Sequence, residues 1–99
     1  MATLYISEYA RMGVSADGQS VPIAGELVGK QTRSLSGSSA QSAAFAKQTR
    51  YVRLHTDAVC SFLIGDNPTA TTSDARLAAD QTEYFEVRPD QKVAAITNT

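Results

Sequence analysis

Alternating polar and apolar residues near the N-terminus predict short β-strands. Residues Thr3–Ser7 place Leu4 and Ile6 on one face, which is the period of a half-buried strand. Asp17-Gly18 predicts a tight turn, because glycine adopts a positive φ at no steric cost. Beyond this turn, Ile23–Val28 is interpreted as a second strand.

The middle of the chain is rich in small residues and has a weaker pattern. Gln31–Leu35 extends the second strand or forms a third. Ser34–Ala44 has the composition of a linker, but the chain has room for one domain only, so we interpret it as a Ser/Ala-rich loop. The loop leads into a small-residue strand over Ala43–Ala46 that carries Phe45. A helix over Ala40–Lys47 is the alternative, because alanine has the highest helix propensity.

The second half of the chain has the clearest strand pattern. Strands are predicted at Arg50–Thr56, Val59–Ile64, Glu83–Val87 and Gln91–Thr97. The run at Val59–Ile64 is dense enough in apolar residues for a central strand, and the turn formers at Gly65–Pro68 end it. The four segments look like two hairpins joined by a long loop.

Taken together, these patterns predict one small all-β domain spanning residues 1–99. Short strands with turns at roughly 8–12-residue spacing are typical of an antiparallel β-sandwich or barrel, jelly-roll-like, with about seven or eight short strands. The C-terminal Asn98 and Thr99 are expected to be frayed. Parity within the strands predicts a core of Leu4, Ile6, Ile23, Leu27, Phe45, Val52, Leu54, Phe62, Ile64, Phe85, Val87 and Val93.

Charge and cysteine content narrow the classes of function. Nine Lys and Arg residues against ten Asp and Glu give a net charge of −1, which argues against nucleic-acid binding by phosphate neutralisation and against a polybasic membrane anchor. The single cysteine, Cys60, and the single histidine, His55, exclude an intrachain disulfide and a cysteine-based zinc site. No apolar run approaches the roughly 20 residues of a membrane span, and the N-terminus shows no signal peptide. Synthesis in a cytoplasm is expected.

Candidate catalytic and metal-binding groups have simpler structural explanations. His55 and Cys60 suggest a thiolate–imidazole pair, but a cysteine inside an apolar strand is typically buried and inert. A Ser-His-Asp triad lacks its G-x-S-x-G turn. Asp66, Asp74 and Asp80 form no calcium-loop motif. We therefore expect no catalytic residue, cofactor or metal.

Arginine and tyrosine residues alternate at the start of the second half. Arg50 and Arg53 flank Tyr51, an interleaving that also occurs on nucleic-acid-binding surfaces. We expect these arginines to pair with carboxylates instead, within the fold or across a subunit contact.

A set of short motifs spans most of the chain. The stretch from Ser42 to Ile96 contains S-x-x-F before T-R-x-V-R, then D-A-x-C, G-x-N-P-T-A-T, R-L-x-A-x-x-x-E-Y-F-x-V and a closing V-A-A-I, and the chain opens with TLYISEYA. In these features it resembles a group of small tailed-bacteriophage proteins of about a hundred residues, encoded among virion structural genes. The resemblance implies a capsid decoration or cement subunit, or a related virion β-domain, and it implies no catalytic residue.

The resemblance implies a non-enzymatic, homo-oligomeric protein that is made in the host bacterial cytoplasm and incorporated into the virion. Its expected partners are the major capsid protein or other virion proteins, not nucleic acid or membrane. Contact loops are expected at Met12–Ser20 and Asn67–Asp74 because both are polar, and the N-terminal strand could pair with a neighbour's sheet edge. The candidate contact residues are Tyr5, Asp66, Asn67, Pro68, Thr69, Ala70, Thr71 and Arg76.

Two alternatives stay open at this point. One is a tail or neck adaptor of the virion, which belongs to the same structural class. The other is a small carbohydrate-binding, receptor-recognition module that uses Tyr5, Tyr51 or Tyr84.

Overall fold

The computed structural model describes residues 2–98, and within them it contains strands and no helix. The strands are β1 (Thr3–Tyr9), β2 (Met12–Val14), β3 (Ser20–Ala24), β4 (Leu27–Ser34), β5 (Ala40–Gln41), β6 (Tyr51–Thr56), β7 (Cys60–Gly65), β8 (Ala75–Leu77), β9 (Thr82–Glu86) and β10 (Lys92–Thr97).

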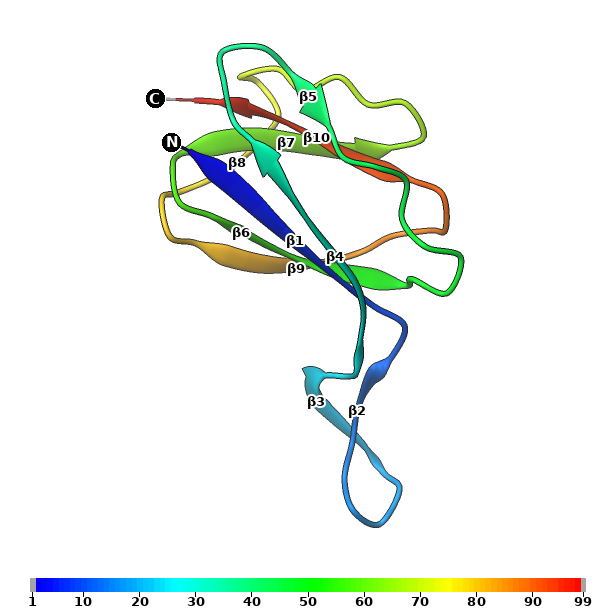
Figure 1. Cartoon of the computed structure of the whole chain (residues 1–99). Helices are drawn as coiled ribbons and strands as arrows, with labels where there is room; N and C mark the ends of the chain where they lie inside the picture. The colour runs from blue at the N-terminus through cyan, green and yellow to red at the C-terminus, as the bar shows by residue number, and fades with distance from the viewer. Residues whose placement is uncertain (1, 99) are drawn as a thin grey trace.

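Eight of these strands form two four-stranded sheets on either side of a shared core (Figure 1). One sheet has the order β4-β1-β6-β9 and the other has the order β5-β10-β7-β8, and every pairing is antiparallel. Most connections cross from one sheet to the other, as they do in a jelly roll. The predicted all-β, antiparallel fold is confirmed, with ten strands in place of about seven or eight.

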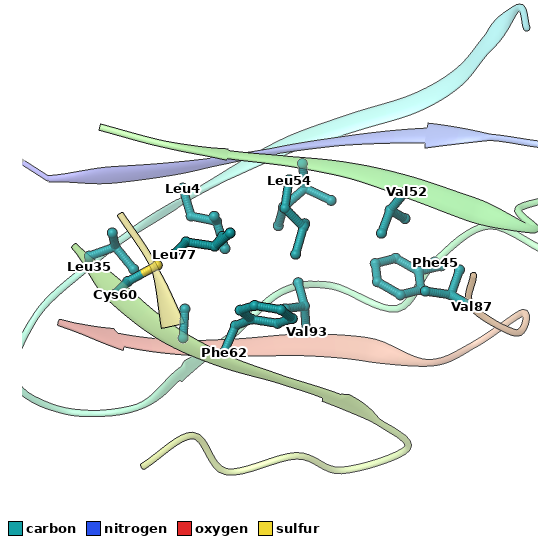
Figure 2. Close-up of a cluster of buried hydrophobic side chains, with 12 residues drawn as sticks. Leu4, Leu35, Phe45, Val52, Leu54, Cys60, Phe62, Leu77, Val87 and Val93 are labelled. Carbon is teal, nitrogen blue, oxygen red and sulfur yellow. The ribbon is translucent and has the colours of Figure 1, made fainter. Parts of the chain in front are cut away.

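The predicted pairing into two hairpins is wrong. β6 pairs with β1 and β9, whereas β7 pairs with β10 and β8. A hairpin would have placed the apolar runs of β6 and β7 in one sheet. The crossover instead places Leu54 and Phe62 in opposite sheets, on the two sides of the core (Figure 2).

The core between the two sheets is a single apolar cluster. Its buried members are Leu4, Ile6, Leu35, Phe45, Val52, Leu54, Cys60, Phe62, Leu77, Val87, Val93 and Ala95. Ile64 and Phe85, also predicted for the core, are partly buried against it. The prediction is wrong for Ile23 and Leu27, which are 61% and 47% exposed, because Ile23 lies on a hairpin outside the sandwich and Leu27 begins the strand that follows that hairpin.

Neither the strand predicted at Ala43–Ala46 nor the alternative helix at Ala40–Lys47 forms. Residues 42–46 are irregular, and between the end of β4 and this stretch the chain has only the short β5. Ser42 N–H donates to the Val93 carbonyl of β10 (2.7 Å). Side chains of the other sheet hold the segment as well, since Ala43 N–H donates to Gln31 Oε1 (2.9 Å) and Ala46 N–H donates to Glu8 Oε1 (2.9 Å). These contacts join the segment to β1 and β4 at one end of the sandwich.

The end of the last strand is tied down, contrary to the expectation of fraying. Asn98 N–H donates to the Val59 carbonyl (3.1 Å), and its side-chain amide donates to Ser61 Oγ (2.7 Å). Thr99 lies outside the described residues.

The remaining two strands, β2 and β3, form a hairpin that projects from the sandwich, away from the chain termini (Figure 1). We call this hairpin, residues 12–24, the arm. The turn predicted at Asp17-Gly18 is at its tip, and Gly18 has the expected positive φ of 88°. Because of the arm the molecule measures 47 × 25 × 21 Å.

Candidate functional site: the arm and the outer face of one sheet

Part of the loop predicted to contact a partner packs against its own chain. Pro68 and Ala70 are buried, whereas the other candidates in this loop, Asp66, Asn67, Thr69 and Thr71, are exposed. The buried positions are tied to residues 39–41, since the Gln41 amide donates to the Pro68 carbonyl (2.7 Å) and Ala70 N–H donates to Ser39 Oγ (2.8 Å). Pro68 and Ala70 therefore have little surface left for a partner, whereas the exposed residues of the loop stay candidate contacts.

The other expected contacts lie apart from one another. Arg76 is exposed on β8, at the edge of one sheet, whereas Tyr5 is exposed on β1 of the other sheet. β1 itself is hydrogen-bonded to β4 on one side and to β6 on the other. Since both of its edges are occupied, the expectation that the N-terminal strand extends a neighbour's sheet is wrong.

The arm carries three of the five large, exposed aliphatic residues among residues 2–98, and the other two are Leu27 at its foot and Leu63 on β7. Met12, Val14 and Ile23 are 46%, 44% and 61% exposed, and Leu27 follows at the foot of the arm. These residues belong to the expected contact loop at Met12–Ser20 or to the strand after it. Clustered apolar residues outside the core are typical of protein interaction sites.

The foot of the arm is held in a defined position by Tyr51 on β6. Its hydroxyl donates to the Arg11 carbonyl (2.9 Å) and accepts from Gly25 N–H (3.0 Å). Gly25 is required there, because a Cβ atom would lie 2.2 Å from the Arg11 carbonyl oxygen. The ring of Tyr9 stacks on Tyr51 at 5.2 Å. The arm is thus anchored to the sheet by specific contacts at both ends of the hairpin, at Arg11 before β2 and at Gly25 after β3.

All four tyrosines of the chain lie on the outer face of the β4-β1-β6-β9 sheet. Alternation along β1 and β6 buries one set of residues and leaves the other set outside. We call the outer set on three adjacent strands the tyrosine face: Tyr5, Ser7 and Tyr9 on β1, Tyr51, Arg53 and His55 on β6, and Thr82, Tyr84 and Glu86 on β9.

Two depressions border the tyrosine face. A groove of about 670 Å³ lies between the arm and the sheet, where Ile23 and Pro22 face Tyr51 and Tyr84. A smaller hollow of about 390 Å³ is lined by residues of β1 and β4, including Tyr5 and Lys30. The face is therefore continuous with the arm on one side and with the edge strand β4 on the other.

The two arginines that flank Tyr51 have different surroundings, and neither forms the expected carboxylate pair among the described residues. Arg50 donates to the carbonyls of Lys47 (3.0 Å) and Thr49 (3.2 Å). Arg53 is half-buried in the middle of the tyrosine face. The one ion pair in residues 2–98 joins Lys47 to Asp90 at 3.8 Å, and its exposure means that it contributes little to stability.

The structure separates the groups considered for catalysis. Cys60 is buried in the core (Figure 2), where burial raises the pKa of its thiol. His55 is on the tyrosine face, with Nδ1 2.7 Å from Thr82 Oγ1. Residues 2–98 contain no cluster of three His, Cys, Asp or Glu side chains that could hold a metal ion. They also contain no helix long and apolar enough to cross a membrane.

Comparisons with known proteins return no match: no family model, curated protein or solved structure is similar to this chain. The candidate site therefore consists of two surfaces of this chain, the arm and the tyrosine face. Sequence reasoning had placed Tyr5, Tyr51 and Arg53 on polar strand faces by their parity. It missed that β1, β6 and β9 are neighbours, because the parity of a strand does not reveal its partners.

Proposed function

We propose that this chain is a non-enzymatic structural protein of a tailed-phage virion, most simply a capsid decoration subunit that binds the head and stabilises it. The sequence motifs from Ser42 to Ile96 support the class. The observation that carries the docking role is the anchored arm, which holds Met12, Val14 and Ile23 outside the core.

The energetics of the arm favour a protein partner. Covering a large aliphatic side chain contributes about 1.5–3 kcal/mol when burial is complete. The arm residues contribute no such burial to the sandwich core, so a neighbouring capsid protein or a second copy of the chain would supply it. Binding only to the assembled head would then stabilise that head by mass action. A tail or neck adaptor would use the same arm, and its copy number in the virion would distinguish it.

The test is to add purified protein to phage particles that lack it, at low and at high salt. We expect Ile23→Lys to weaken binding by about tenfold or more, because it places a charge in an apolar contact. The control is Ala79→Lys, which adds the same charge at an exposed turn. Circular dichroism checks that both variants are folded.

The pattern of results decides between surfaces. Loss of binding in Ile23→Lys alone, with little salt dependence, supports the arm. Equal binding by the two variants would remove the arm from the contact. Binding that disappears as salt rises would instead indicate charged residues such as Arg76.

A second candidate, a carbohydrate-binding module, is favoured by one specific observation. Tyr5, Tyr51 and Tyr84, the three residues considered for sugar stacking, lie on the same sheet face. Specific binding to a glycan, with none to particles, would favour this candidate over the decoration subunit.

A further inference from the structure

Arg53 occupies the centre of the tyrosine face. The strand register places it opposite Ser7 on β1 and opposite Tyr84 on β9, with Tyr51 and His55 as neighbours along β6. Directly opposed residues have Cβ atoms about 4.5–5.5 Å apart, so the guanidinium is surrounded by aromatic and hydroxyl side chains. None of the ion pairs or hydrogen bonds of residues 2–98 involves its side chain.

A half-buried guanidinium without an anionic partner is suited to bind an anion from outside the chain. Its planar set of donors matches a carboxylate, and such charge-assisted hydrogen bonds are among the strongest in proteins. The one carboxylate among the nine residues of the face is that of Glu86, which the register places opposite Tyr51 and diagonal to Arg53, and no ion pair joins Glu86 to Arg53. The centre of the face is thus positively charged, although the chain as a whole has a charge of −1.

The two most exposed aromatic rings of the face lie on either side of Arg53. Tyr84 is 52% exposed and lies directly across from it, whereas Tyr5 is 44% exposed and packs beside His55 with ring centroids 6.1 Å apart. The other groups are engaged: the Tyr51 hydroxyl holds the arm, and His55 contacts Thr82. Tyr84 and Tyr5 therefore offer apolar ring surfaces next to a free cation.

The side chains of the tyrosine face favour a saccharide over a protein or a nucleic acid. The nine residues that define the face are aromatic, hydroxyl-bearing or charged. Most of the exposed aliphatic residues lie instead on the arm or at its foot, where Leu27 pairs with Tyr9. Single-stranded nucleic acid would bring one phosphate per nucleotide. The face offers such a nucleic acid only two cations, Arg53 at its centre and Lys30 at its border, which is too few to neutralise a run of phosphates.

We propose that the tyrosine face binds an acidic saccharide, with a sugar carboxylate paired to Arg53 and a pyranose ring stacked on Tyr84. The hollow beside β4 would receive the next sugar unit, where Lys30 lies near Tyr5. This inference deepens the carbohydrate-binding candidate, and it does not require that the arm docks on a virion.

The test is a titration of the intact chain with oligomers of galacturonate, mannuronate and N-acetylneuraminate, followed by calorimetry and by amide chemical shifts. The neutral comparator is the methyl ester of each oligomer, which keeps the sugar and removes the charge. We expect at least one acid oligomer to bind about tenfold or more tightly than its ester, with shifts on β1, β6 and β9.

Matched variants locate the contact. Arg53→Gln and Tyr84→Ala should each weaken the binding of that acid oligomer by about tenfold or more. Arg76→Gln removes an exposed arginine from the other sheet and should leave binding unchanged. Melting temperatures check that each variant is folded, and particle binding by Arg53→Gln should equal that of the unsubstituted chain.

Three results would overturn the proposal. They are the absence of binding to every acid oligomer, equal binding of acid and ester, and tighter binding of a thymidine oligonucleotide than of any saccharide. Failure of the arm variants in the particle assay is a separate result, because it concerns residues outside the tyrosine face.

Discussion

Glu8 shows how one residue can organise a region that the sequence pattern leaves undefined. It shares the inner face of β1 with Leu4 and Ile6 and is 5% exposed. Its carboxylate accepts from Ala46 N–H (2.9 Å) and from Thr49 Oγ1 (2.8 Å), which compensates for its burial. Glu8 lies one residue beyond the strand predicted at Thr3–Ser7, and its partners lie about 40 residues away in the chain, a distance over which the alternation within a strand gives no information.

Cys60 gives a prediction on pH. Burial raises the pKa of the folded-state thiol above its ordinary value of 9.0, with a smaller opposing effect from a hydrogen bond to Thr56. As the pH rises, the thiol of the unfolded chain begins to lose its proton near pH 9.0, before the thiol of the folded chain does. The contribution of the thiol to the free energy of unfolding is therefore complete below that pH and decreases above it. Relative to Cys60→Ala, the free energy of unfolding should fall by up to about 1.4 kcal/mol per pH unit.

Urea unfolding of both proteins between about pH 8 and pH 10.5 measures this difference. The titration of tyrosines and lysines cancels in the comparison, because both proteins contain them. Parallel pH profiles would show that the Cys60 thiol titrates equally in the folded and unfolded chains.

Strands were easier to predict than their pairing. The second half of the chain has β6, β7, β9 and β10 close to the predicted ranges, and Val52 and Leu54 are buried as parity requires. Period-2 alternation identifies the inward face of a strand, but it is the same whether β6 and β7 pair as a hairpin or lie in opposite sheets. The same limit explains why Ile23 was wrongly placed in the core, because an apolar residue of a strand gives the same pattern in a core and on an exposed arm.

The anchoring of the arm gives a prediction about its dynamics. Tyr51→Phe removes the hydroxyl that bonds to Arg11 and Gly25, and each lost hydrogen bond costs about 0.5–1.5 kcal/mol. Amide hydrogen exchange in the arm should accelerate by roughly tenfold, with the β7 and β10 amides unchanged. The control is Tyr5→Phe, whose hydroxyl forms no hydrogen bond among the described residues; equal exchange in the two variants would show that Tyr51 does not hold the arm.

At the scale of the whole molecule, the arm and the tyrosine face expose different types of side chain. Most exposed aliphatic residues lie on the arm or at its foot, whereas the tyrosines lie on the outer face of one sheet, around the single cation Arg53. The sequence suggested members of each: the loop at Met12–Ser20 became part of the arm, and Tyr5 became part of the tyrosine face. It also suggested Pro68 and Ala70, which are buried. A stretch of small residues has the same sequence pattern whether it packs against another molecule or against its own chain.

The proposed function places this chain in the virion of a tailed phage, and its most direct test is the copy number of the chain in purified virions, measured by quantitative mass spectrometry. A decoration subunit is predicted to be present in a fixed proportion to the major capsid protein and to remain bound through particle purification. A small, fixed number of copies per particle would move the protein to the tail or neck. Its absence from virions, with the chain abundant in the infected cell, would contradict the structural role.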